Sequence, residues 1–143
     1  MSEGIAIVMP ATFPGSVEDS HCTNVFLGVV SPELHFTKDH LLNVCFDLEA
    51  IFSRNVDRLF KVSGVDWFGV DRDVPVMRLD SSWLMHFRKV LDQYLWEEAE
   101  IKSASEWDYQ PHVTLPEGYD VSDLPDYVLL RKPVVWWGEE PWA

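Results

Sequence analysis

The stretch HCTNVFLG, from His21 to Gly28, places a histidine and a threonine two residues apart at the start of an apolar segment. A short apolar run of this kind predicts a β-strand, and in an extended chain residues i and i+2 point to the same side. The side chains of His21 and Thr23 are therefore expected to stand next to each other on one face of a sheet. An imidazole and a hydroxyl in that position can bind an anion together.

The same pattern recurs in YQPHVTLPEG, from Tyr109 to Gly118, which contains His112 and Thr114. The two histidines are 112 − 21 = 91 residues apart, a spacing that suits an internal duplication in which each half contributes one strand to a shared cleft. Imidazole titrates near neutrality, so two copies can supply a general base and a general acid at the same pH. The sequence therefore predicts two matched His/Thr pairs.

The length and composition of the chain indicate which class of protein to expect. A chain of 143 residues, 47% apolar and 13% aromatic, is the size of one domain, and we expect residues 1–143 to form a single domain. The first residues, MSEGIAIVMP, do not have the pattern of a signal peptide, and no stretch reaches membrane-spanning length, so a soluble, cytoplasmic protein is expected. Cys22 and Cys45 lack the spacing of a zinc or redox motif and are expected to stay reduced.

The net charge of the chain argues against long nucleic acids as partners. The formal net charge is −13, from 24 acidic and 11 basic residues, and such a field repels long polyanions such as duplex nucleic acid. A small nucleotide remains a possible ligand, because a few local hydrogen-bond donors can outweigh a screened, distant field.

Alternating strand and helix patterns predict an α+β domain in two similar lobes. A third His-x-Thr stretch, from His35 to Thr37, precedes a helical pattern, so we interpret Thr37 as a helix cap and His35 as a surface residue. Asp80, Ser81 and Ser82 are capping candidates for a second helix. The expected strands lie near 4–10, 21–28, 59–64, 65–70, 74–80, 112–115, 127–130 and 134–137, and the expected helices near 38–54 and 84–95.

The two motifs, HCTNVFLG and PHVTL, resemble the paired signatures of the 2H phosphoesterase superfamily, which includes LigT-like RNA 2′,5′ ligases and cyclic phosphodiesterases. The middle stretch FGVDRDVPVMRLD and the late Trp-rich strand are also similar to that family. The resemblance implies a bilobed fold of two pseudo-symmetric antiparallel sheets, with helices outside and both motifs facing one central groove.

The resemblance also implies a mechanism that needs no metal ion and no cofactor. His21 and His112 would act as general base and general acid, and the hydroxyls of Thr23 and Thr114 would hold the phosphate oxygens. The substrate would be a small nucleotide or short oligonucleotide with a cyclic or 2′,5′-linked phosphodiester. Which histidine is the acid, the direction of the reaction and the substrate base are left open by the sequence.

Aromatic residues near the second motif are candidates for contact with a nucleobase. Trp107 and Tyr109 precede His112 in a loop-like stretch and could stack on a base at the rim of the groove, although packing is the commoner role of such residues. The other tryptophans in predicted strands or helices, Trp136 among them, are expected to belong to the core.

Two alternatives stay open. Bacteriophage members of the same superfamily degrade the cyclic di- and trinucleotide signals of bacterial immunity, and a compact acidic enzyme fits that substrate as well. A non-catalytic module that sequesters a nucleotide is the alternative from another class, although a pure binder has no special need for two groups that titrate near pH 7. In either case we expect a monomer with a small-molecule partner and no membrane association.

Overall fold

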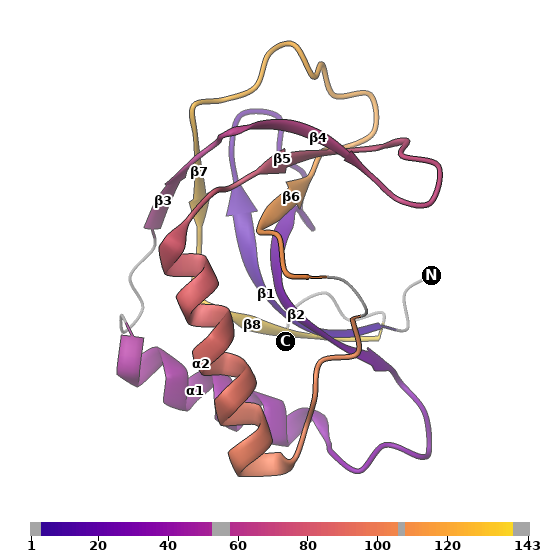
Figure 1. Ribbon diagram of the computed structural model, residues 1–143, viewed down its shortest axis with the longest axis vertical. Helices are drawn as coiled ribbons and strands as arrows, with labels where there is room; N and C mark the ends of the chain where they lie inside the picture. Colours follow the sequence, from indigo (N-terminus) through magenta and orange to yellow (C-terminus); the bar gives the residue numbers. More distant parts are fainter. Residues whose placement is uncertain (1–3, 53–57, 106–107, 139–143) are drawn as a thin grey trace.

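The computed structural model describes residues 4–52, 58–105 and 108–138, and it combines eight strands in one sheet with two helices (Figure 1). The expected α+β class is therefore confirmed. The elements are β1 (Gly4–Thr12), β2 (His21–Val29), α1 (Lys38–Phe52), β3 (Arg58–Lys61), β4 (Gly64–Phe68), β5 (Val74–Arg78), α2 (Ser82–Ala99), β6 (His112–Thr114), β7 (Tyr127–Leu130) and β8 (Val134–Trp137).

The two motif strands lie side by side in the middle of the sheet. The strand order is β3-β7-β1-β2-β6-β5-β4, all described pairs are antiparallel, and β8 also pairs with β1. Strands β7 and β8 use successive stretches of the same edge of β1, since Leu130 pairs with Ala11 and Val134 with Val8. Strand β2 is therefore flanked on one side by β1 and β8, and β6 is flanked on the other side by β5 and β4.

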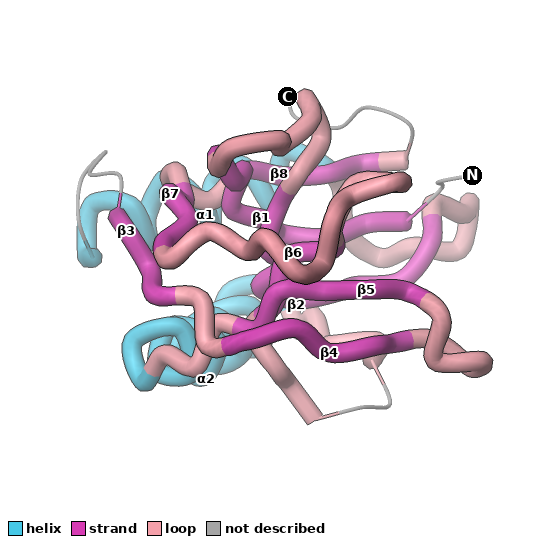
Figure 2. The backbone as a smooth tube through the Cα atoms, turned by 90° about the horizontal axis from the view of Figure 1, so that it is seen from above, coloured by secondary structure: helices cyan, strands magenta, loops and turns pink. Residues whose placement is uncertain are grey.

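The hydrophobic core lies between one face of this sheet and the two helices. Figures 1 and 2 show both helices against the same side of a twisted sheet, and α1 contacts β8 while α2 contacts β2. Alternate residues of the central strands point into this core, as expected for a sheet that is covered on one side. The buried residues of the sheet include Ile5, Ile7, Met9, Cys22, Met77 and Val113, and those of the helices include Leu41, Val44, Leu48, Leu84, Phe87, Leu91 and Leu95.

Both helices begin at the predicted caps. The hydroxyl of Ser81 accepts a hydrogen bond from Leu84 N at 3.1 Å, and the hydroxyl of Thr37 accepts one from His40 N at 3.4 Å. His40 returns this contact, because its Nδ1 accepts a hydrogen bond from Thr37 N at 3.1 Å. Such reciprocal bonds satisfy backbone donors that have no partner within the first turn of a helix.

The element boundaries differ from the prediction at a few places. Strand β1 extends two residues beyond Pro10, and α1 is described as far as Phe52, so the predicted helix end at Arg54 lies outside the described residues. Neither of the two helices has the combination of length and hydrophobicity that crossing a membrane requires, within the ranges that the structure describes.

Candidate active site

The two His/Thr pairs meet on the face of the sheet that the helices leave uncovered. Cys22 of β2 pairs with Val113 of β6, and both side chains are fully buried on the core side. In an antiparallel pair the residue numbers of opposite residues have a constant sum, here 22 + 113 = 135. The same register places His21 opposite Thr114 (21 + 114) and Thr23 opposite His112 (23 + 112). We call the face that carries these four side chains the open face.

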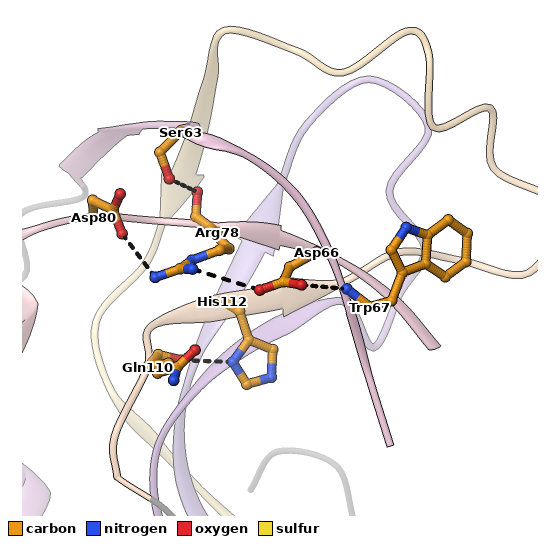
Figure 3. Close-up of polar contacts among 7 residues, drawn as sticks. All are labelled: Ser63, Asp66, Trp67, Arg78, Asp80, Gln110 and His112. Carbon is orange, nitrogen blue, oxygen red and sulfur yellow. Dashed lines mark hydrogen bonds and ion pairs between the residues drawn. The ribbon is translucent and has the colours of Figure 1, made fainter. Parts of the chain in front are cut away.

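The two histidines have the same local hydrogen bond. His21 Nδ1 lies 2.7 Å from the carbonyl oxygen of Asp19, and His112 Nδ1 lies 2.7 Å from the carbonyl oxygen of Gln110 (Figure 3 shows the second contact). A carbonyl oxygen only accepts, so Nδ1 carries the proton and donates in both cases. The Nε2 atom of each neutral ring is then the basic atom, and after protonation it is a donor. Both rings are therefore held in the tautomer that general acid–base catalysis requires.

Each histidine ring also contacts an aromatic ring from two strands away. The centroids of His21 and Trp136 of β8 are 4.9 Å apart, and those of His112 and Phe68 of β4 are 4.6 Å apart. Trp136 is half-buried and not part of the core, so its predicted role was wrong. Neither aromatic contact was found from the sequence, because each depends on strands that lie far from the motif along the chain.

The surroundings of His112 favour its neutral form. Burial lowers the pKa of His112 below its usual value of 6.5, and the positive charge of His21 lowers it further, against the opposing effect of the Gln110 carbonyl. The register of β2 with β6 places the two imidazoles on the same face of adjacent strands. A neutral imidazole near pH 7 is suited to accept a proton.

An arginine that the sequence did not single out lies next to His112. Arg78 of β5 pairs with His112 of β6, and its guanidinium lies between the carboxylates of Asp66 and Asp80, 3.5 Å from each (Figure 3). The corresponding neighbour of His21 on β1 is Pro10. The sequence showed an arginine at the end of a strand pattern, but only the register of β5 with β6 places it beside the second motif.

A buried polar cluster supports the motif strands from the core side. Strand β2 bulges at Asn24, since Val8 pairs with Thr23 and Ile7 with Val25, which leaves Asn24 as the extra residue. Arg88 of α2 donates from Nη1 to the carbonyl oxygen of Asn24 at 3.1 Å.

The remaining contacts of this cluster involve the chain that leads into β6. The guanidinium of Arg88 lies 4.9 Å from the centre of the Tyr109 ring, and Tyr109 comes three residues before His112. Arg88 therefore connects α2 with both motif segments.

The two aromatic residues predicted to contact a base have different outcomes. The hydroxyl of Tyr109 is buried beside Cys22 and Asn24, and burial raises its pKa. One face of its ring is covered by Arg88, so we leave Tyr109 out of the substrate contacts proposed below. Trp107 lies outside the described residues.

Within residues 4–52, 58–105 and 108–138, no group of three or more His, Cys, Asp or Glu side chains is arranged to hold a metal ion. Cys22 and Cys45 are both buried in the core, and burial raises the pKa of the Cys22 thiol to about 11. No protein-family model matches the sequence, and no curated protein is significantly similar to it.

Proposed function

We propose that the chain is a phosphodiesterase of the 2H type, with a bilobed arrangement around the β2–β6 pair, and that it hydrolyses a cyclic or 2′,5′-linked phosphodiester in a small nucleotide. One observation supports this proposal. The two His/Thr pairs are 91 residues apart in the chain but lie on adjacent antiparallel strands of the open face, so that each histidine is diagonally opposed to the other and directly opposite the other pair's threonine. A phosphate placed over these four side chains would have an imidazole on each side and two hydroxyl donors.

The lowered pKa of His112 supports its assignment as the general base. In hydrolysis of a 2′,3′-cyclic phosphate, His112 Nε2 takes a proton from water as the water oxygen bonds to phosphorus. The bond from phosphorus to one ribose oxygen breaks, and protonated His21 donates its Nε2 proton to that leaving oxygen. Exchange of protons with solvent then restores both histidines for the next turnover.

The threonines have a different part in this mechanism. The hydroxyls of Thr23 and Thr114 would donate hydrogen bonds to the non-bridging phosphate oxygens, whose negative charge increases in the transition state. Cationic His21 would add to that stabilisation. A metal ion is not required for any of these proton transfers, so turnover is expected to persist in EDTA.

The proposal is tested by product formation from 2′,3′-cyclic mononucleotides, 2′,5′-linked dinucleotides and cyclic dinucleotides, followed by chromatography and mass spectrometry in EDTA. His21→Ala and His112→Ala should each lower turnover by about 10²- to 10⁴-fold with little change in melting temperature. His35→Ala is the matched control, because His35 belongs to the third His-x-Thr stretch and is exposed. Full turnover by both histidine variants would rule the mechanism out, and stoichiometric binding of intact ligand would indicate a sequestering module.

A further inference from the structure

The strands that flank the two His/Thr pairs are related by the same approximate twofold symmetry as the pairs. Thr23 has Val8 of β1 as its neighbour, and Thr114 has Val76 of β5. One strand further out, the aromatic ring of Trp136 contacts His21 as that of Phe68 contacts His112. The two sides of the open face are therefore built alike at these positions.

The symmetry is broken at two positions that adjoin each other. Arg78, the neighbour of His112, corresponds to Pro10 on the His21 side. Asp66 of β4 pairs with Val76. The equivalent residue on the other side is Val134 of β8, which pairs with Val8. An ion pair on one side thus replaces two apolar residues on the other, and catalysis by two equivalent His/Thr pairs does not require this difference.

The ion pair retains hydrogen-bonding capacity. Arg78 and Asp66 are 3.5 Å apart, and their side chains are 39% and 36% exposed. Charge-assisted bonds are normally about 2.7–2.9 Å long, so this contact is loose, and exposed pairs of this kind are weak. Arg78 has five N–H donors, of which its two contacts with carboxylates use two. Asp66 accepts from Trp67 N at 2.8 Å and has room for further donors.

The local charge distinguishes between two kinds of ligand. Arg78 with Asp66 and Asp80 has a formal charge of 1 − 2 = −1, within a chain of charge −13. A second phosphate would meet net repulsion there, whereas a neutral group that offers both an acceptor and donors would meet complementary partners. Of the parts of a nucleotide, the edge of a nucleobase has this character. Arg78 pairs with His112 across β5 and β6, and Figure 3 shows the ion pair beside the His112 side chain.

We infer that Arg78 and Asp66 form a nucleobase site on the His112 side of the open face, and that this site prefers guanine. The inference rests on the proposed function, because it assumes that the scissile phosphate lies at the two His/Thr pairs. Guanine presents an acceptor, O6, beside two donors, N1–H and N2–H. The guanidinium of Arg78 would donate to O6, and the two carboxylate oxygens of Asp66 would accept from N1–H and N2–H.

Two measurements test this inference. The first is kcat/KM for the 2′,3′-cyclic phosphates of the four nucleosides. The second is calorimetric binding of the four nucleoside 3′-monophosphates, which does not depend on turnover. The wild type should favour the guanosine compounds by about tenfold or more, the discrimination expected of one bidentate pair. Asp66→Asn and Arg78→Gln should bring the four bases within about threefold of one another, whereas Glu33→Gln, which removes an exposed charge elsewhere, should keep the preference.

Each outcome decides between the alternatives. Equal binding of the four bases by the wild type, or a guanine preference that survives Asp66→Asn, overturns the inference. If Arg78→Gln instead weakens adenosine 3′,5′-bisphosphate selectively relative to adenosine 3′-monophosphate, Arg78 binds a second phosphate and the base site is wrong. A guanine preference in binding without any turnover supports the base site and contradicts the proposed hydrolysis.

Discussion

Replacement of Arg88 by methionine tests whether the motif strands depend on support from α2. Arg88 has a side chain only 13% exposed, and it donates to Asn24 O at 3.1 Å and to Asp92 Oδ2 at 2.9 Å. Arg88→Met keeps an unbranched apolar stem but removes the charged donors, so both contacts and the cation–π contact with Tyr109 are lost together.

The expected loss of stability follows from these three contacts. A hydrogen bond from a charged donor to a shielded carbonyl is worth about 1.5–3 kcal/mol. The cation–π contact adds about 0.5–1 kcal/mol. The pair with Asp92, whose side chain is 44% exposed, adds about 0.5 kcal/mol or less after solvent screening. We expect the free energy of unfolding to fall by about 3 kcal/mol, which in a chain of this size lowers the melting temperature by roughly 10 °C.

Urea denaturation and calorimetry of three variants measure this effect. Lys89→Met is the matched control, because Lys89 is the next residue of the same helix and is exposed, so a change within about 0.5 kcal/mol is expected. Arg88→Lys keeps the charge without the planar guanidinium and should be intermediate. If Arg88→Met proves no less stable than Lys89→Met, Arg88 does not support the motif strands and the reasoning fails.

Three further predictions concern the pH dependence of activity, the pH dependence of stability, and the core. Burial lowers the pKa of His112. If His112 is the general base, kcat/KM should fall at acidic pH with an apparent pKa below 6.5, because the neutral base is lost there. An apparent pKa at or above 6.5 would contradict this role. The lowered pKa of His112 should also make the folded state less stable as the pH falls from 6.5 through the pKa of His112 in the folded state, because His112 of the unfolded chain takes up a proton first. Urea titrations at several pH values measure this loss of stability. Leu91→Ala in α2 should cost about 2–5 kcal/mol, since Leu91 is 0% exposed, whereas Met85→Ala, at 41% exposed, should stay within about 0.5 kcal/mol in the same titrations.

The residues proposed for catalysis could be found from the sequence because their relation is local. His21 and Thr23 point to one side of a strand, as do His112 and Thr114, and this follows from the geometry of an extended chain alone. The helix caps at Thr37 and Ser81 were predictable for the same reason, since a cap and the backbone group that it satisfies lie within one turn.

The side chains around those pairs could not be found in this way. Arg78 reaches His112 only because β5 pairs with β6 in one register, and a shift of one residue would turn Arg78 toward the core. Tyr109 was a candidate for contact with a base, but the guanidinium of Arg88, contributed by α2, covers one face of its ring. These arrangements depend on contacts between segments that are distant in the chain.

The sequence by itself therefore determined the α+β class, most of the helices and strands, and two His/Thr pairs that each share a face. The tertiary structure decided that β2 and β6 are adjacent and antiparallel, so that the pairs are diagonally opposed, and that the two sides of the open face differ at Arg78 and Asp66. The physical reason is that hydrophobic periodicity and capping act over a few residues. Strand partners and register are instead selected by backbone hydrogen bonds and core packing across the whole chain.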